Sequence, residues 1–167
     1  MSVTLDRLRE RVATATDEKS RFYALTRLAI ELAQLGRAQE ARDVIGALRA
    51  SATIGGSGLL AIYLVLIDGI CSYYDGLQLI SLDRLNRAHA LSVASGDRRL
   101  VGEAGVWLAL ASYSFDKLDW LERSLVSAAK CADVLETSSA ARLSAVLADL
   151  WQLVGSTTDS ATWYMHS

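Results

Sequence analysis

Apolar residues recur at helical spacing along most of the chain, interrupted by short polar or glycine-containing segments. Ser2 and Ser81 are candidate N-caps, because a serine oxygen accepts a hydrogen bond from a free N–H of the first helical turn. A further helix is expected to open near Asp159. The predicted helices are Val3–Ala15, Glu18–Leu35, Ala38–Ser51, Leu59–Tyr74, Leu82–Ala94, Arg99–Ser114, Lys117–Glu136 and Ala140–Val154.

A turn position recurs every 39 or 40 residues. Gly36, Gly76 and Gly155 each follow an apolar helical run, and Asp116 stands midway between the last two. A glycine just after a helix suits the left-handed C′ position, where a side chain would clash. The spacing therefore predicts a repeated helix-turn-helix unit of about 40 residues.

Small residues follow the same period and predict close helix–helix contacts, because small side chains let two helices approach. One position in this pattern is unusual: Asp68 stands eight residues before its turn, where the other three units have leucine. The positions seven residues before the turns are Ala29, Gly69, Ala109 and Ala148, preceded by Leu28, Asp68, Leu108 and Leu147. The positions twelve residues after the first three turns are Leu48, Ala88 and Ala128.

These features resemble the tetratricopeptide repeat, most closely in the first unit, where Gly-Arg-Ala-Gln-Glu-Ala spans 36–41. The usual period of that family is 34 residues, against about 40 here. The resemblance implies an all-α, right-handed α-solenoid of about 3.5 helix pairs after a leading helix, in a single domain. The repeats would cover about 17–51, 58–95, 98–136 and 139–167, the last being incomplete.

The long form of the repeat is similar to regulatory regions of bacterial signalling proteins, which often precede an output domain such as a diguanylate cyclase. The resemblance therefore implies a sensory or regulatory region and no enzyme activity of its own. The unfinished aromatic segment at 162–167 leads us to expect the front part of a longer chain. The expected partner is a protein or peptide segment, or the chain's own downstream output domain.

Composition narrows the function further. The 167 residues contain no proline, where a typical chain would have roughly eight, and this favours helix. A net charge of −2 gives no general reason to bind nucleic acid or anionic lipid. The apolar run Leu59–Ile67 is too short to span a membrane. Cys71 and Cys131 lie in apolar helical patterns and predict buried, reduced thiols in a cytoplasmic protein.

No arrangement of residues typical of catalysis or of a cofactor site occurs in the sequence. The two histidines, His89 and His166, are far apart, and the cysteines lack zinc-ligand spacing. The glycine-rich stretch 55–58 lacks the lysine of a phosphate-binding loop, so we interpret residues 52–58 as a linker. We expect no metal, no cofactor and no catalytic residue.

The resemblance places the first helix of each pair on a concave, partner-binding surface. Tyrosines suit such a surface, because each combines a large apolar face with a polar hydroxyl. Tyr73 and Tyr113 occupy equivalent positions and are expected side by side. The alternative is that these residues belong to the core. The groove candidates are Tyr23, Ile30, Tyr63, Leu66, Asp68, Ile70, Tyr73, Val106, Leu110 and Tyr113.

Asp68 has two interpretations. An unpaired carboxylate in an apolar run costs several kcal/mol, so a partner such as an arginine of a neighbouring helix is one expectation. The other is a polar contact within a ligand pocket, which would make the chain a small-molecule sensor. A third possibility for the whole chain is homodimerisation, with the helix around Leu59–Ile67 packing two copies together.

Overall fold

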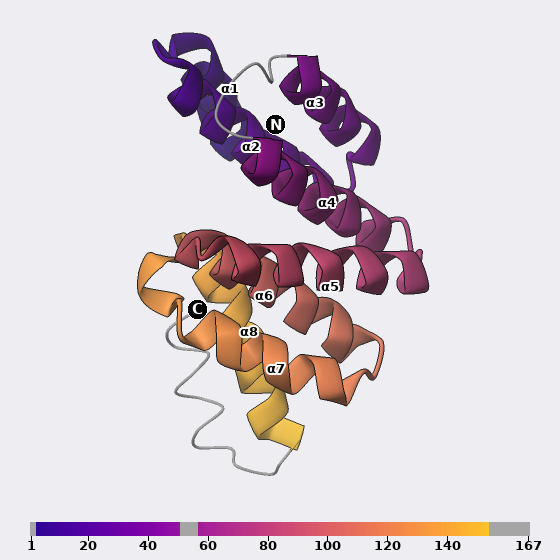
Figure 1. The fold of residues 1–167 in the computed structure, drawn as a ribbon. Coiled ribbons are helices and arrows are strands. Elements are labelled where there is room, and N and C mark those ends of the chain that lie inside the picture. The colour runs from indigo at the N-terminus through magenta and orange to yellow at the C-terminus, as the bar shows by residue number, and fades with distance from the viewer. Residues whose placement is uncertain (1–2, 51–56, 154–167) are drawn as a thin grey trace. The chain divides into compact units, whose positions relative to one another are not determined.

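The computed structural model describes residues 3–50 and 57–153, and these fold into helices without any strand (Figure 1). The all-α prediction is therefore confirmed for this part of the chain. Two compact units are distinguished, one ending at Ala88 and one beginning at His89, and α5 contributes to both. The helices are α1 (Val3–Thr14), α2 (Glu18–Gln34), α3 (Ala38–Ala50), α4 (Ser57–Tyr74), α5 (Gln78–Ser95), α6 (Arg98–Ser114), α7 (Leu118–Ala129), the 3-10 helix η1 (Ala132–Val134) and α8 (Thr137–Leu153).

In the first unit, helix pairs pack through their apolar faces. α2 packs against α1 and α3, and α4 packs against both α2 and α3. Residues 59–67 of α4 form part of the resulting core, with Ile62, Tyr63, Leu66 and Ile67 buried and only Ala61 exposed. The apolar run thus belongs to a core helix, as the sequence predicted. Its role in packing two copies of the chain together stays a prediction, because Leu59, Leu60, Leu64 and Val65 are only half-buried.

The second unit is built around α6, which contacts α7, η1 and α8. Most of α6 is buried, including Trp107, which is fully enclosed. A Cβ added to Gly105 would lie 3.3 Å from the Cβ of Ala128, so α6 and α7 approach closely there. The predicted role of the small residue at Ala128 is confirmed.

The predicted period is present in the backbone as a repeated turn. Gly36 and Gly76 have φ of 71° and 74°, and Asp116 has φ of 55° at the same position of the third turn. Each donates its N–H to the carbonyl three residues earlier, and the following residue donates to the carbonyl five residues before it. This pair of bonds is the Schellman motif, which satisfies carbonyls left free at a helix end. Gly155 lies outside the described residues.

Several predicted helix boundaries are wrong. α8 begins at Thr137 rather than at Ala140, and α4 begins at Ser57, so residues 57–58 of the predicted linker belong to a helix. α5 begins four residues before the predicted Leu82, and the candidate cap Ser81 instead lies buried within the helix, where its hydroxyl donates to the carbonyl of Gly69. α7 ends at Ala129 rather than at Glu136, and the chain continues as η1. Ser2 and the helix expected near Asp159 lie outside the described residues.

Candidate functional site

The ten predicted groove residues divide into two sets by exposure. Five are at least 93% buried and have no surface to offer a partner: Ile30, Tyr63, Leu66, Ile70 and Val106. The other five are partly exposed: Tyr23, Asp68, Tyr73, Leu110 and Tyr113. Among the predicted residues, only this second set can contribute directly to a binding surface.

Aromatic rings from α2 and α4 meet in the first unit. Tyr23 and Tyr63, which are 40 residues apart, have ring centroids 6.5 Å apart, and Phe22 packs edge-on against both. The contact shows that equivalent positions of two successive first helices lie next to each other here. Edge-to-face rings at this spacing add stability beyond the area that they bury.

A second aromatic pair lies at the end of α4. The rings of Tyr73 and Tyr74 are perpendicular, with centroids 5.2 Å apart. Tyr73 is partly exposed, and Tyr74 is 40% exposed. This pair offers aromatic surface next to the turn that connects α4 to α5.

Tyr113 and Leu110 lie in the second unit, where both pack against the core cluster formed by Ala109, Leu121 and Val146. Their outer parts remain exposed. Because Tyr73 and Tyr113 belong to different units, the predicted proximity of these two side chains stays a prediction.

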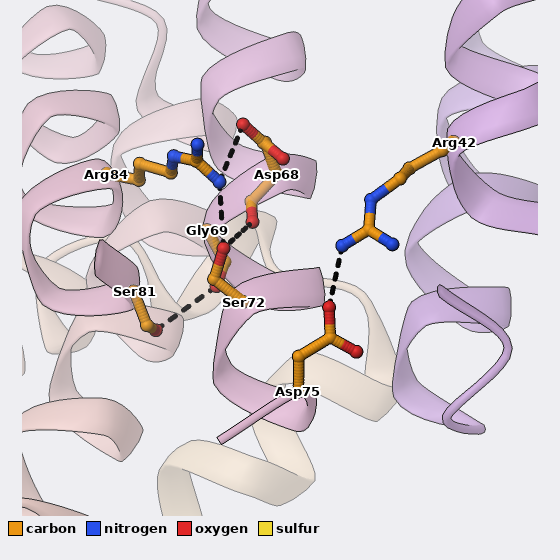
Figure 2. Close-up of polar contacts among 7 residues, drawn as sticks. All are labelled: Arg42, Asp68, Gly69, Ser72, Asp75, Ser81 and Arg84. Carbon is orange, nitrogen blue, oxygen red and sulfur yellow. Dashed lines mark hydrogen bonds and ion pairs between the residues drawn. The ribbon is translucent and has the colours of Figure 1, made fainter. Parts of the chain in front are cut away.

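Asp68 of α4 pairs with Arg84 of α5 (Figure 2). An oxygen of the carboxylate lies 2.9 Å from Nη1 of Arg84, which also donates to the hydroxyl of Ser72 at 2.8 Å. The Ser72 hydroxyl in turn donates to the carbonyl of Asp68. The expectation of an arginine partner on a neighbouring helix is confirmed. Because both charged side chains are more than a third exposed, the pair contributes only ~0–1 kcal/mol.

Residues 40 positions before and after this polar group differ from it in type. Leu28 and Leu108 occupy the position of Asp68, and Val44 and Ser124 occupy that of Arg84. The acid and the base therefore occur together, and neither has a charged residue 40 positions before or after it. A Cβ added to Gly69 would lie 2.8 Å from Leu85, so the backbones of α4 and α5 are close beside the pair.

A second ion pair ties the turn after α4 to α3, with Nη2 of Arg42 2.6 Å from a carboxylate oxygen of Asp75 (Figure 2). The hydrogen bond that Arg42 donates to the carboxylate of Asp75 is the main reason that the pKa of Arg42 is raised. Between the two pairs, burial raises the pKa of the Cys71 thiol to about 11. Cys71 therefore stays a thiol near neutral pH, as a core residue rather than a nucleophile.

A buried polar group in the second unit was missed by the sequence analysis. Glu103 of α6 is 6% exposed, and its carboxylate accepts from the indole N–H of Trp107 at 3.2 Å and from the hydroxyl of Ser139 on α8 at 2.6 Å. The guanidinium of Arg142 lies 5.0 Å from the centre of the Trp107 ring. Glu103 interrupts an apolar run just as Asp68 does, and the same criterion applied there identifies it.

Within residues 3–50 and 57–153, no three His, Cys, Asp or Glu side chains are grouped so that they could hold a metal ion. None of the described helices combines the length and apolar character that crossing a bilayer requires. No protein-family model, curated protein or solved structure matches this chain.

Proposed function

We propose that this chain is an interaction module of tetratricopeptide-like helix pairs, about three and a half in number and stacked as a right-handed solenoid. The three equivalent turns at Gly36, Gly76 and Asp116 support a common repeated unit. The contact between Tyr23 and Tyr63 supports the stacking of first helices in the first unit. α6 and α8, the corresponding helices of the second unit, also contact each other.

The partner is an amphipathic helical segment of another protein or of a downstream output domain. The observation that carries this choice is the partly exposed Tyr73–Tyr74 pair, because exposed aromatic surface suits the apolar face of an amphipathic helix. Tyr23 in the first unit, and Leu110 and Tyr113 in the second, are the partly exposed candidates on the other first helices. The resemblance to bacterial regulatory regions supports a role in signalling.

A selection of helical peptides from a displayed library tests this function. Peptides that bind the natural chain are expected to bind the Tyr73→Ala variant at least tenfold more weakly, since interface tyrosines often contribute 1–2 kcal/mol or more. Tyr113→Ala should weaken binding in the same direction. Leu118→Ala is the matched control, because Leu118 is 69% exposed but lies on α7, outside the proposed surface.

Circular dichroism and thermal unfolding of each variant distinguish a binding surface from the core. Helicity and melting temperature should change little for Tyr73→Ala. The proposal is wrong if selected peptides bind all three variants as tightly as the natural chain, or if both tyrosine variants unfold.

A further inference from the structure

The exposed face of α5 is unusually apolar for a surface helix. Leu79 is 80% exposed, Ile80 43% and Leu91 37%. Ala90 and Ala94 are also exposed on this side of the helix. A helix that lies on a protein surface normally presents charged and polar residues to water, and an apolar second face indicates a partner.

The opposite face of α5 is already used. Leu82, Leu85 and Ala88 are at most 3% exposed, together with the hydroxyl-bearing Ser81 and Ser92. At 100° per residue these positions centre on the side opposite the exposed residues. Because α5 is one uninterrupted helix, helix geometry alone fixes this relation. The exposed apolar residues are therefore a second face, which no part of residues 3–50 and 57–153 covers.

Two charged residues interrupt that face. Asp83 and Arg87 are both exposed, and they lie one turn apart in the row Leu79–Asp83–Arg87–Leu91. Neither residue has an ion-pair partner in the part of the chain that the structure describes. This face therefore suits a partner whose surface places a basic residue opposite Asp83 and an acidic residue opposite Arg87.

A second copy of the same helix meets that requirement. When two α5 helices pack antiparallel about a two-fold axis at the level of residue 85, residues whose numbers add to 170 face each other. Leu79 then meets Leu91 of the second copy, and Asp83 meets Arg87, each contact occurring twice. A two-fold interface requires such self-complementarity, which few sequences provide by chance.

We propose that the exposed face of α5, defined by Leu79, Ile80, Asp83, Arg87 and Leu91, forms an antiparallel two-fold interface with a second copy of this chain. The apolar residues supply the contact area, and the two crossed ion pairs fix the register. None of these residues belongs to the proposed peptide-binding surface, so the two proposals stand or fall separately.

Sedimentation equilibrium of the purified chain over a concentration series tests the interface. The natural chain is expected to form dimers, and Asp83→Arg and Arg87→Asp should each weaken dimerisation by roughly tenfold or more, because like charges then face each other. The double variant carrying both changes should regain the natural affinity, since the reversed charges pair again across the two-fold axis. Leu118→Lys, at an exposed leucine outside α5, is the control and should dimerise normally.

Engineered cysteines test the antiparallel register directly. A mixture of the Leu79→Cys and Leu91→Cys variants should form a disulfide between copies, whereas Leu79→Cys alone should not. In the proposed dimer two copies of position 79 are separated by about 18 Å along the helix, beyond the reach of a disulfide. The natural cysteines, Cys71 and Cys131, are buried and should not interfere.

Three results would overturn the inference. The first is a monomer at every concentration up to about 500 µM, including a monomer whose α5 face binds a different protein. The second is a dimer that is indifferent to both single charge reversals. The third is a charge-swapped double variant that stays as weak as the single variants, which excludes the two-fold pairing of Asp83 with Arg87.

Discussion

Three residues in left-handed backbone end helices of this protein at equivalent positions. Gly36 and Gly76 adopt this conformation readily, and Asp116 is the one non-glycine residue with positive φ in the described ranges. Aspartate tolerates the region better than most residues, because its short side chain can bond locally. The sequence predicted the turn at Asp116 only through its spacing from the glycines, since the residue alone gives a weak signal.

Alanine substitutions at two glycines should have opposite effects. Gly36→Ala is expected to lower the free energy of unfolding by about 1–2 kcal/mol, because a side chain is strained at φ of 71°. Gly46→Ala, inside α3, should raise it by ~0.5–1 kcal/mol through better helix propensity. An added Cβ meets nothing within 4 Å at either position, so urea unfolding isolates the backbone effect. Equal effects at the two glycines would contradict this account.

His89 should make stability depend on pH. Its Nε2 atom is buried without a hydrogen-bond partner in the described structure, and burial, helped by the charge of Arg123, lowers its pKa below 6.5. The unfolded chain therefore binds the proton more tightly than the folded chain. The contribution of His89 to unfolding free energy should be constant above about pH 6.5 and should fall as pH decreases below it.

The His89→Gln variant provides the control for this pH dependence. Urea unfolding at a series of pH values between 4.5 and 8 should give a shallower decline for the variant than for the natural chain. If the unfolding free energy falls with decreasing pH equally steeply for both proteins, groups other than His89 cause the acid sensitivity.

At the scale of elements, the carboxylate of Glu103 connects α6 to α8. Ser139→Ala removes one of its hydrogen bonds within the core and should lower the free energy of unfolding by about 1–3 kcal/mol. Ser127→Ala is the control, because Ser127 is half-buried on α7 and has no such bond; its effect should stay within about 0.5 kcal/mol. Equal losses for the two variants in urea unfolding would show that the contact with Glu103 contributes little.

The ion pair between Asp68 of α4 and Arg84 of α5 should be replaceable by apolar residues with little loss of stability. The combined change Asp68→Leu and Arg84→Val introduces the residues that the first repeat has at these positions, and it should alter the unfolding free energy by less than about 1 kcal/mol. Arg84→Val alone should be worse than the combination, because Asp68 then loses its partner. A large loss for the double variant would mean that the pair specifies the packing of the two helices.

Helix boundaries were least predictable where tertiary contacts set them. Ser81 is a plausible cap by type, yet its hydroxyl bonds the carbonyl of Gly69 on another helix, which only the fold reveals. α7 ends without a proline or glycine. The chain turns there so that Cys131 and Leu135 lie against Gly102, where a Cβ would come within 2.9 Å of Cys131 and 2.8 Å of Leu135.

For the whole molecule, the sequence predicted the helices and their repeated turns but only part of the candidate site. The helical spacing of apolar residues identifies the apolar positions of a helix. When a helix has two apolar faces, that spacing does not tell which of them a neighbouring helix buries. Ile70 and Val106 are thus enclosed although they were predicted for the groove, whereas Leu79 is exposed although nothing singled it out. The polar residues within apolar runs were more informative. An arginine partner was one of the two interpretations of Asp68, and Glu103, which also interrupts an apolar run, likewise has polar partners on a neighbouring helix.

The apolar character of α4 has a consequence for how the protein is made. The helix has α2 and α3 to pack against as soon as it leaves the ribosome, but at Gly69 it packs against Leu85, which is synthesised later. A nascent chain halted at Asp75 therefore exposes apolar surface of α4 to chaperones and to other unfinished chains. A soluble fragment of the first unit has to include α5 at least as far as Ala88.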